Sequence, residues 1–485
     1  MRRQQANCLF LNRRTDIPAG ILHSQEVNPT MNGTSHAQPI RRQNRIRSIA
    51  SFGILGIMTA SAFASGFPPS PALPTPTGSM TLSPSGPFIS SSTTPGPTSA
   101  PRPDKRGSDT YTYLRCWYRI SHNQLEPGGT YKWALDPGAG DWYRVPGYWW
   151  ADGITHWKNM FYSETAQETL LDVCRKTLDM HGIQRDVTQA LAANNQFSFN
   201  YTVWTLDSAR QDQRINKMIV FGDSLSDTQN MFNASQWKLP NNSSWHMGRF
   251  SNGPVWAEYL ANFLDLPMYN WAIGGSATDR YLVVPGLLQQ VESWQEYMNR
   301  APNYHPGNTL FTVLAGGNDL VNYRRPPLQA AKAVHDSLDK LVQSGAKHIV
   351  LVNLPDVSRA PIFSTRSDAA RVAEEVKTFN HILTEAVAEL RGRYGATLNI
   401  EIFDAYTLFN DLMMRPESYG FDDVTRSCLD IRNPSALSYI RSQTPRVDCR
   451  DPGRFVFWDT LHPSTRAHAW LAWKLAGHIR GFVKK

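Results

Sequence analysis

The sequence predicts an α/β fold in which helices cover both faces of a parallel sheet, preceded by a smaller aromatic-rich domain that contains β-strands. Two observations lead to this prediction. From residue 214 onward, short apolar runs alternate with amphipathic segments, as buried parallel strands alternate with their crossover helices. Residues 108–213 lack this alternation and are rich in aromatic and turn-forming residues. A chain of 485 residues is also long enough for more than one domain.

Residues 1–64 have the features of an export leader. The basic stretch RRQNRIR (41–47) precedes the apolar run IASFGILGIMTASAFA (49–64), which ends in the small-x-small pattern of a cleavage site. Such a combination is typical of a secretory signal. The apolar run is short for a membrane span, but an uncleaved anchor is the alternative. We expect a secreted, extracellular protein whose translation starts at Met31, just upstream of the signal.

The charge of the chain argues against a nucleic-acid partner. The formal net charge is +8, and residues 1–64 carry +6 of it through eight arginines and two acidic residues. The remaining residues therefore have too small an excess of basic side chains for an extended phosphate-binding surface.

The segments that follow the leader differ in composition. Residues 65–107 are rich in Pro, Ser, Thr and Gly, which predicts an extended linker. In the aromatic-rich domain (108–213), YTYLRCWYRI (111–120) alternates like a strand, and 164–182 has the spacing of a helix. Six of the fifteen tryptophans lie between Trp117 and Trp157. Their rings either form a small core or face outward towards a membrane or a ligand.

The cysteines predict disulfides. Apart from Cys8 in the leader, four cysteines form two pairs that are local in sequence, Cys116 with Cys174 and Cys428 with Cys449. An even number in an exported chain favours disulfides, and the absence of Cys-x-x-Cys spacing disfavours zinc. Four cysteines allow three connectivities, of which we expect local pairing.

The C-terminal region (214–485) contains five strand candidates and two long helix candidates. The strands are expected at 217–221, 266–273, 309–316, 348–355 and 398–405, and the helices at 327–345 and 368–390. In a parallel sheet the carboxyl ends of the strands meet at one edge, where functional residues gather.

Several polar residues follow these strands directly. Ser224 comes after the first strand, Gly275 after the second and Asn318 after the third, while Asp459 and His462 lie near the chain end. A serine hydroxyl needs a base to become nucleophilic, and a histidine oriented by a carboxylate provides one. The N–H groups of Ser224 and Gly275 and the Asn318 amide are candidate oxyanion donors.

Each of these residues also has an ordinary structural interpretation. Ser224 follows a strand and a glycine and is a good candidate for a helix N-cap. Asp-x-x-His is often a capped turn, a Gly-Gly pair often only turn geometry, and Asn318 could hold a loop through backbone contacts. The occurrence of all these groups after successive strands favours the catalytic interpretation.

Four motifs resemble the blocks of the GDSL, or SGNH, hydrolases: FGDSLSD (221–227), NWAIGGSAT (270–278), GGND (316–319) and DTLHPS (459–464). The resemblance covers residues 215–485. It implies a flavodoxin-like three-layer α/β/α fold, with Ser224 as nucleophile and Asp459 and His462 as its partners. It also implies Gly275 and Asn318 as oxyanion donors. Separately, no motif in the sequence suggests a metal cluster or a nucleotide loop, so we expect no metal and no cofactor.

A narrower resemblance concerns the substrate. The first two blocks are similar to those of bacterial lecithinases and glycerophospholipid-cholesterol acyltransferases, and RCWYR, YWW and MFYSE resemble the N-terminal domain of thermolabile haemolysins. This implies hydrolysis of phospholipid acyl esters, as a phospholipase A or lysophospholipase at a membrane surface. Acyl transfer to an alcohol such as a sterol is a further expectation. The alternatives are a carbohydrate or general carboxyl esterase, and a membrane- or receptor-binding module with a vestigial catalytic fold.

Residues 410–455 are polar and carry Cys428 and Cys449. We expect a disulfide-stapled surface loop here. Because the segment precedes Asp459 and His462, a lid or a wall of the acyl pocket is the alternative.

Overall fold

The computed structural model describes residues 111–483, apart from 151–156, 194–198, 200, 206–213 and 302. The expected leader (1–64), its start at Met31 and the expected linker (65–107) therefore lie outside the described residues. In the part of the chain that is described, no helix combines the length and the apolar character needed to cross a bilayer.

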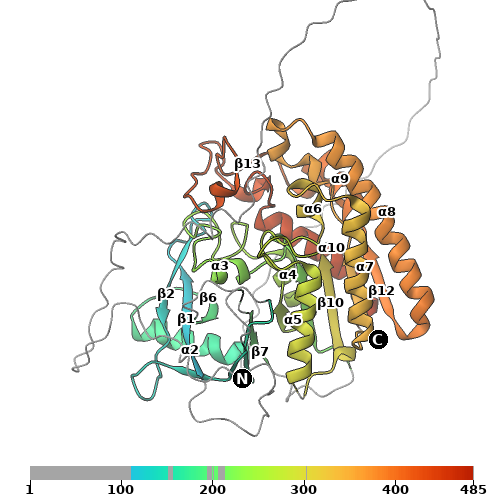
Figure 1. Cartoon of the computed structure of the whole chain (residues 1–485). Helices are drawn as coiled ribbons and strands as arrows, with labels where there is room; N and C mark the ends of the chain where they lie inside the picture. Colours follow the sequence, from blue (N-terminus) through green and yellow to red (C-terminus); the bar gives the residue numbers. More distant parts are fainter. Residues whose placement is uncertain are drawn as a thin grey trace, which may run out of the picture. The chain divides into compact units, whose positions relative to one another are not determined.

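A five-stranded parallel sheet, whose strands β10 and β12 are labelled in Figure 1, forms the centre of the C-terminal region. The strand order is β12-β11-β10-β8-β9. Its strands are β8 (Lys217–Gly222), β9 (Met268–Asn270), β10 (Thr309–Leu314), β11 (His348–Val352) and β12 (Asn399–Phe403). All five lie where the sequence predicts them. Beyond the short β9, the N–H groups of Trp271 and Ile273 still donate to carbonyls of β8, so this segment continues along the sheet.

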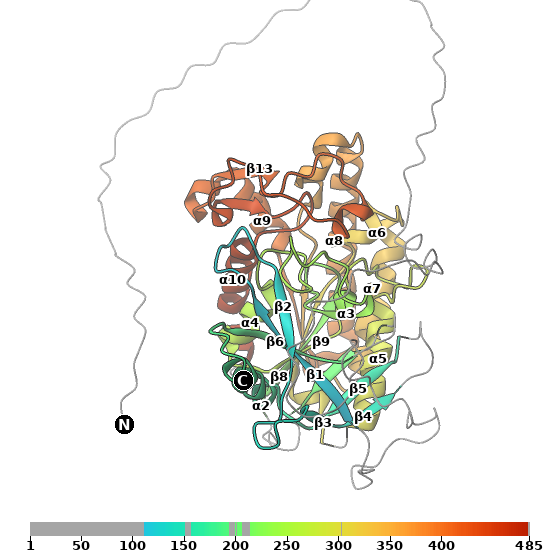
Figure 2. The same ribbon diagram turned by 90° about the vertical axis from the view of Figure 1, so that its left-hand side faces the viewer.

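Helices cover both faces of this sheet. On one face lie α4 (Trp256–Leu264) and α10 (Thr465–Val483), and on the other lie α5 (Leu287–Arg300), α7 (Pro327–Gln343) and α8 (Ala369–Tyr394) (Figure 2). Successive strand residues serve opposite faces: Val220 packs in the cluster with α4 and α10, whereas Phe221 packs with α5, α7 and α8. Burial on both faces explains why the strands are continuous apolar runs. The α/β/α fold class predicted from the sequence is confirmed.

Shorter elements sit near the carboxyl edge of the sheet or in the region that follows it. They are the helices α3 (Asn230–Ala234), α6 (Gly317–Val321) and α9 (Ala405–Met414), and the parallel strand pair β13 (Asp423–Ser427) and β14 (Phe455–Phe457). The single-turn helix η3 (Val357–Arg359) follows β11.

The described residues before 206 form two small sheets and a helix. In the first sheet, β1 (Tyr111–Arg119) pairs antiparallel with β2 (Gly129–Trp133), β3 (Arg144–Pro146) and β6 (Val187–Ala192). The second sheet consists of β4 (Tyr148–Trp150), β5 (Met160–Ser163) and β7 (Tyr201–Trp204). The helix α2 (Gln167–Met180) packs on the first sheet and agrees with the helix expected at 164–182.

The four cysteines form two disulfides with the expected local pairing. Cys116 in β1 is joined to Cys174 in α2, and Cys428 is joined to Cys449. Contrary to the expectation of a stapled surface loop, the second disulfide is buried. Cys428 and Cys449 are 0% and 1% exposed, because they pack in a cluster with Trp245 and Trp458. The disulfide therefore belongs to a small core beside the sheet edge.

Removal of the second disulfide should destabilise the protein measurably. Its half-cystines are 21 residues apart, and loop-closure entropy predicts that Cys428→Ala/Cys449→Ala lowers the free energy of unfolding by about 3 kcal/mol. Urea denaturation of oxidised wild-type and variant protein measures the difference. Peptide mass mapping that finds both thiols free in oxidised wild-type protein would contradict the assignment.

Candidate active site

Ser224 lies in the turn that follows β8 and is 8% exposed. Its Oγ is 2.8 Å from Nε2 of His462, and no helix begins at this serine. The capping role falls instead to Asp227, whose carboxylate accepts N–H bonds from the residues that open α3. Ser224 is thus free to present its hydroxyl to the histidine.

Asp459 and His462 meet through a tight turn after β14. The N–H of Trp458 donates to the His462 carbonyl at 2.9 Å and closes the turn. The ring Nδ1 of His462 then lies 2.9 Å from Oδ2 and 3.0 Å from Oδ1 of Asp459. Since a carboxylate only accepts, Nδ1 is the protonated nitrogen, and Nε2 faces the Ser224 hydroxyl as an acceptor.

Asp459 is completely buried and is surrounded by donors. Burial alone would raise the pKa of Asp459, but the charge and ring N–H of His462, together with the backbone N–H groups of Leu461 and His462, hold this pKa below its usual value. The carboxyl group is therefore ionised at neutral pH, as an acceptor for the histidine must be.

Two further side chains around this pair were not predicted. The indole Nε1 of Trp245 donates to Oδ2 of Asp459 at 2.9 Å, and the Tyr439 hydroxyl lies 3.4 Å from Nδ1 of His462. Trp245 lies in a loop and Tyr439 ends the short helix η7 (Ala436–Tyr439), and neither segment carries a recognisable motif. Only their three-dimensional position identifies them.

The candidate oxyanion donors lie at the carboxyl edge of the sheet. Within the described residues, the backbone N–H groups of Ser224 and Gly275 donate to no protein acceptor. By contrast, the N–H of Gly274 is taken by the Asp227 carboxylate at 2.7 Å. Gly275 has a φ of 79°, which favours glycine. Between the two neighbouring glycines, Gly275 is the one whose N–H remains available.

Asn318 is the second residue of α6, lines the same cavity as Ser224 and is 8% exposed. One N–H of its amide donates to the Ser276 carbonyl at 2.9 Å, and its Oδ1 accepts from Asn322 at 2.7 Å. Asn318 therefore does hold the loop after β9 through its bond to the Ser276 carbonyl, as its ordinary structural interpretation expects. An amide group has two N–H donors, so these contacts leave one for a ligand.

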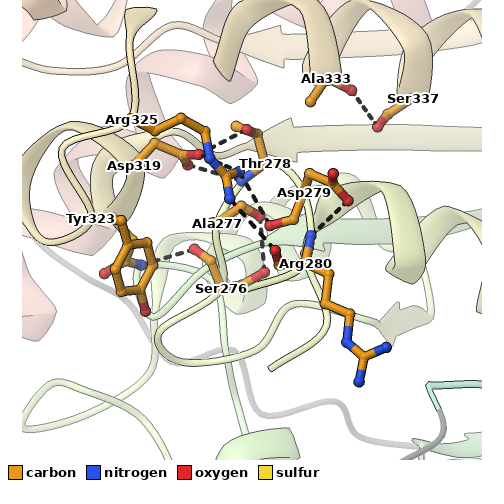
Figure 3. A network of polar contacts seen from close by, with 12 residues as sticks. Ser276, Ala277, Thr278, Asp279, Arg280, Asp319, Tyr323, Arg325, Ala333 and Ser337 are labelled. Carbon is orange, nitrogen blue, oxygen red and sulfur yellow. Dashed lines mark hydrogen bonds and ion pairs between the residues drawn. The ribbon is translucent and has the colours of Figure 1, made fainter. Parts of the chain in front are cut away.

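A buried ionic network holds residues 276–280, which directly follow Gly275 in the chain (Figure 3). Asp319 is 0% exposed and accepts from the Thr278 N–H at 2.8 Å, the Thr278 hydroxyl at 2.9 Å and the Arg325 guanidinium at 2.9 Å. Burial raises the pKa of Asp319, and the charge of Arg325 opposes this rise. The Tyr323 hydroxyl also donates to the Gly275 carbonyl at 2.6 Å. These contacts connect α6 and the segment after it to the loop after β9.

A cavity of about 990 Å³, including the open space at its mouth, extends from Ser224 and His462. Its walls come from β10, β11, η3, α9, β14 and α10, and most of the side chains are apolar, among them Val357, Phe409, Leu412, Trp470 and Leu471. Of residues 410–455, the segment expected to form a stapled loop or a pocket wall, only Leu412 is among the lining residues of this cavity.

The fold and the site define a carboxylic ester hydrolase. Residues 218–475 match the family described as GDSL-like Lipase/Acylhydrolase, and residues 82–206 match the one described as Vibrio dual lipase/transferase, N-terminal domain. The chain belongs to the GDSL-like lipase/acylhydrolase family.

Among its relatives is the thermolabile hemolysin of Vibrio parahaemolyticus, which is 40% identical over 373 residues, covering 76% of this chain and 88% of that protein. A phosphatidylcholine-sterol acyltransferase of Aeromonas hydrophila is 27% identical, covering 55% of this chain and 91% of its own length. A solved carbohydrate acetylesterase from Sinorhizobium meliloti aligns with 55% of this chain and 99% of its own at 12% identity and a TM-score of 0.34. The last similarity is too low to bear on the substrate.

The Asp319 network should contribute strongly to stability. Asp319→Ala removes the carboxylate partner of Arg325 and the acceptor of both Thr278 donors, which typically costs about 3–5 kcal/mol for a buried ion pair. Asp336→Ala is the matched control, because its pair with Lys332 is exposed and should contribute less than about 1 kcal/mol. Urea denaturation compares the two variants, and equal losses would contradict the prediction.

Proposed function

We propose that the protein is an exported serine esterase that hydrolyses acyl esters of phospholipids, as a phospholipase A or lysophospholipase, through an acyl-enzyme on Ser224. The observation that carries the proposal is the 2.8 Å contact between Ser224 Oγ and His462 Nε2 at the wall of an apolar cavity. Asp459 completes the arrangement by accepting from the other ring nitrogen.

In the first half-reaction, Ser224 Oγ attacks the carbonyl carbon of the ester and His462 Nε2 takes the hydroxyl proton. Asp459 stabilises the imidazolium that forms. The negative charge moves to the former carbonyl oxygen, for which the N–H groups of Ser224 and Gly275 and the Asn318 amide are the proposed donors. The imidazolium then gives its proton to the departing alcohol, which is the lysophospholipid or glycerol part of the substrate.

In the second half-reaction an acceptor attacks the acyl group on Ser224. His462 removes a proton from water or from an alcohol, and the collapse of the second tetrahedral intermediate returns the proton to Ser224. Water gives a free fatty acid, whereas an alcohol such as a sterol gives a new ester. Both outcomes use the same groups, so the availability of the acceptor decides between hydrolysis and transfer.

The lining of the cavity favours a long acyl chain. Most of the lining side chains are apolar, so a fatty acyl chain would remove more of its own apolar surface and of the wall from water than an acetyl group would. A carbohydrate or general carboxyl esterase is the weaker alternative for this reason.

Two relatives support the lipid substrate and the acceptor. One is named thermolabile hemolysin and the other phosphatidylcholine-sterol acyltransferase. The signal-like residues 41–64 support export, and residues 214–485 and 108–213 are proposed as the hydrolase domain and a preceding domain. A membrane surface is the corresponding partner.

Ser224→Ala should abolish catalysis, because no other hydroxyl is hydrogen-bonded to His462 Nε2 in the described residues. Loss of the nucleophile typically lowers kcat on the order of 10⁵-fold or more. The measurement is fatty-acid release from phosphatidylcholine liposomes with and without cholesterol, analysed by mass spectrometry.

Acetate release from acetylated xylan serves as the comparison substrate, and circular dichroism verifies the fold of the variant. Undiminished ester hydrolysis by folded Ser224→Ala protein would refute the nucleophile. Faster turnover of xylan than of phosphatidylcholine would refute the lipid substrate.

Substitution in the cavity wall should change the preference for acyl length. Val357→Phe adds volume at η3 inside the cavity, so the ratio of kcat/KM for a 16-carbon over a 4-carbon p-nitrophenyl ester should fall by at least about fivefold. Val447→Phe is the same substitution at a residue that is 98% exposed and should leave the ratio unchanged. Equal ratios for both variants would show that the cavity does not hold the acyl chain.

A further inference from the structure

The tryptophan that donates to the catalytic carboxylate lies in a loop that is hydrogen-bonded to the N-terminal part of the chain. Trp245 is 0% exposed and belongs to the loop 241–249 between α3 and α4. Its Nε1 donates to Oδ2 of Asp459 at 2.9 Å, the oxygen that faces Nδ1 of His462 at the same distance. The backbone donors of the 459–462 turn use Oδ1 only. The Tyr439 side chain is also hydrogen-bonded to Asp459, so Trp245 is one of several donors, among them the ring N–H of His462, that orient the carboxylate, and its indole binds Oδ2 directly.

Residues of the first N-terminal sheet and its β1–β2 connection bind this loop on both sides of Trp245. The Asn242 side chain exchanges two hydrogen bonds with the backbone of Gly129, and Nδ1 of His246 lies 3.1 Å from the Pro127 carbonyl. Burial lowers the pKa of His246 to about 3, so its ring is neutral and Nδ1 carries the donated proton. On β6, Gln189 Nε2 donates to the Met247 carbonyl at 2.8 Å.

Two glycines make the close approach possible. A Cβ at Gly128 would lie 2.3 Å from the carbonyl oxygen of Asn242, and one at Gly129 would lie 2.2 Å from Sδ of Met247. Neither distance is compatible with van der Waals packing. Leu125 also packs on the buried cluster that contains Trp245 and the Cys428–Cys449 disulfide. We call residues 125–129 the docking loop.

We propose that the docking loop and Gln189 are positioning elements of the catalytic site, acting through Trp245 on Asp459. The proposal rests on the proposed function, because it assigns to the N-terminal part of the chain a role in the turnover of the same site. By holding the backbone of 242–247, these contacts fix the indole N–H at the carboxylate and so fix the carboxylate on the histidine. Catalysis depends on this orientation because a misaligned Asp459 no longer selects the required tautomer.

A small displacement of the docking loop should therefore lower turnover without weakening substrate binding. Gly128→Ala is expected to reduce kcat for a soluble p-nitrophenyl butyrate at least tenfold, with KM within twofold of wild type, and to slow labelling of Ser224 by a fluorophosphonate to a similar extent. Gly138→Ala is the matched control, since its Cβ would approach nothing closer than 3.4 Å and its contact is to Asp136 of its own turn. Kinetics comparable to wild type in folded Gly128→Ala protein would overturn the proposal.

A second pair of variants keeps the test decisive if Gly128→Ala folds poorly. Gln189→Ala removes the bond to the Met247 carbonyl and an acceptor of the Arg249 guanidinium without introducing a clash, and it should likewise lower kcat while KM stays within twofold of wild type. Trp245→Phe removes only the indole donor and should lower kcat about tenfold. Trp294→Phe removes a buried indole donor to Tyr304 away from the site and should leave kcat unchanged.

In the double variant Gln189→Ala/Trp245→Phe, the loss of kcat should not exceed that of Trp245→Phe alone. Multiplying losses would show that Gln189 does not act through the indole, and would overturn the proposal.

The same assays separate this proposal from the proposed function. Ser224→Ala is measured in parallel, and its full activity would refute the proposed function whatever the other variants do. An inactive Ser224→Ala together with normal kcat in Gln189→Ala and Gly128→Ala would refute the positioning role alone. A change confined to liposome hydrolysis would also refute the positioning role and would show that the N-terminal part acts by contact with the lipid surface.

Discussion

The hydrogen bond between Ser224 and His462 joins residues 238 positions apart in the chain, and the rest of the site is arranged around it. The parallel sheet makes this contact possible. It delivers the ends of β8 and β10 to one edge, and the turn after β14 reaches the same edge from the C-terminal side. Since the strands are covered by helices on both faces, this edge is where polar groups can meet a ligand.

Buried carboxylates hold the loops of this edge in place. Asp227 accepts from the start of α3 and from the Gly274 N–H, and Asp319 accepts from Thr278 and Arg325. A buried donor without an acceptor is costly, so each carboxylate strongly favours one loop conformation. At the site, the N–H of Gly274 donates to Asp227, whereas the N–H of the neighbouring Gly275 stays available for a ligand.

The two sides of the site differ in chemical character. One side is the apolar cavity between the sheet edge, α9 and α10. The other is a packed cluster of Trp245, Trp458 and the Cys428–Cys449 disulfide, against which the docking loop lies. The first side suits an acyl chain, and on the second the indole of Trp245 donates to Asp459 behind the histidine. In this arrangement the disulfide stabilises the scaffold of the site and does not cover its entrance.

The sequence by itself determined the strand–helix order, the local pairing of the cysteines and the polar groups that follow each strand. These features depend on near neighbours, namely on the periodicity of apolar residues and on short motifs around Ser224, Asn318 and His462. The burial of the Cys428–Cys449 disulfide, the availability of Gly275 and the roles of Trp245 and Tyr323 were decided only by the tertiary structure. Each of them depends on a partner far away in the chain, and no spacing within a segment records which distant atom a buried donor will meet.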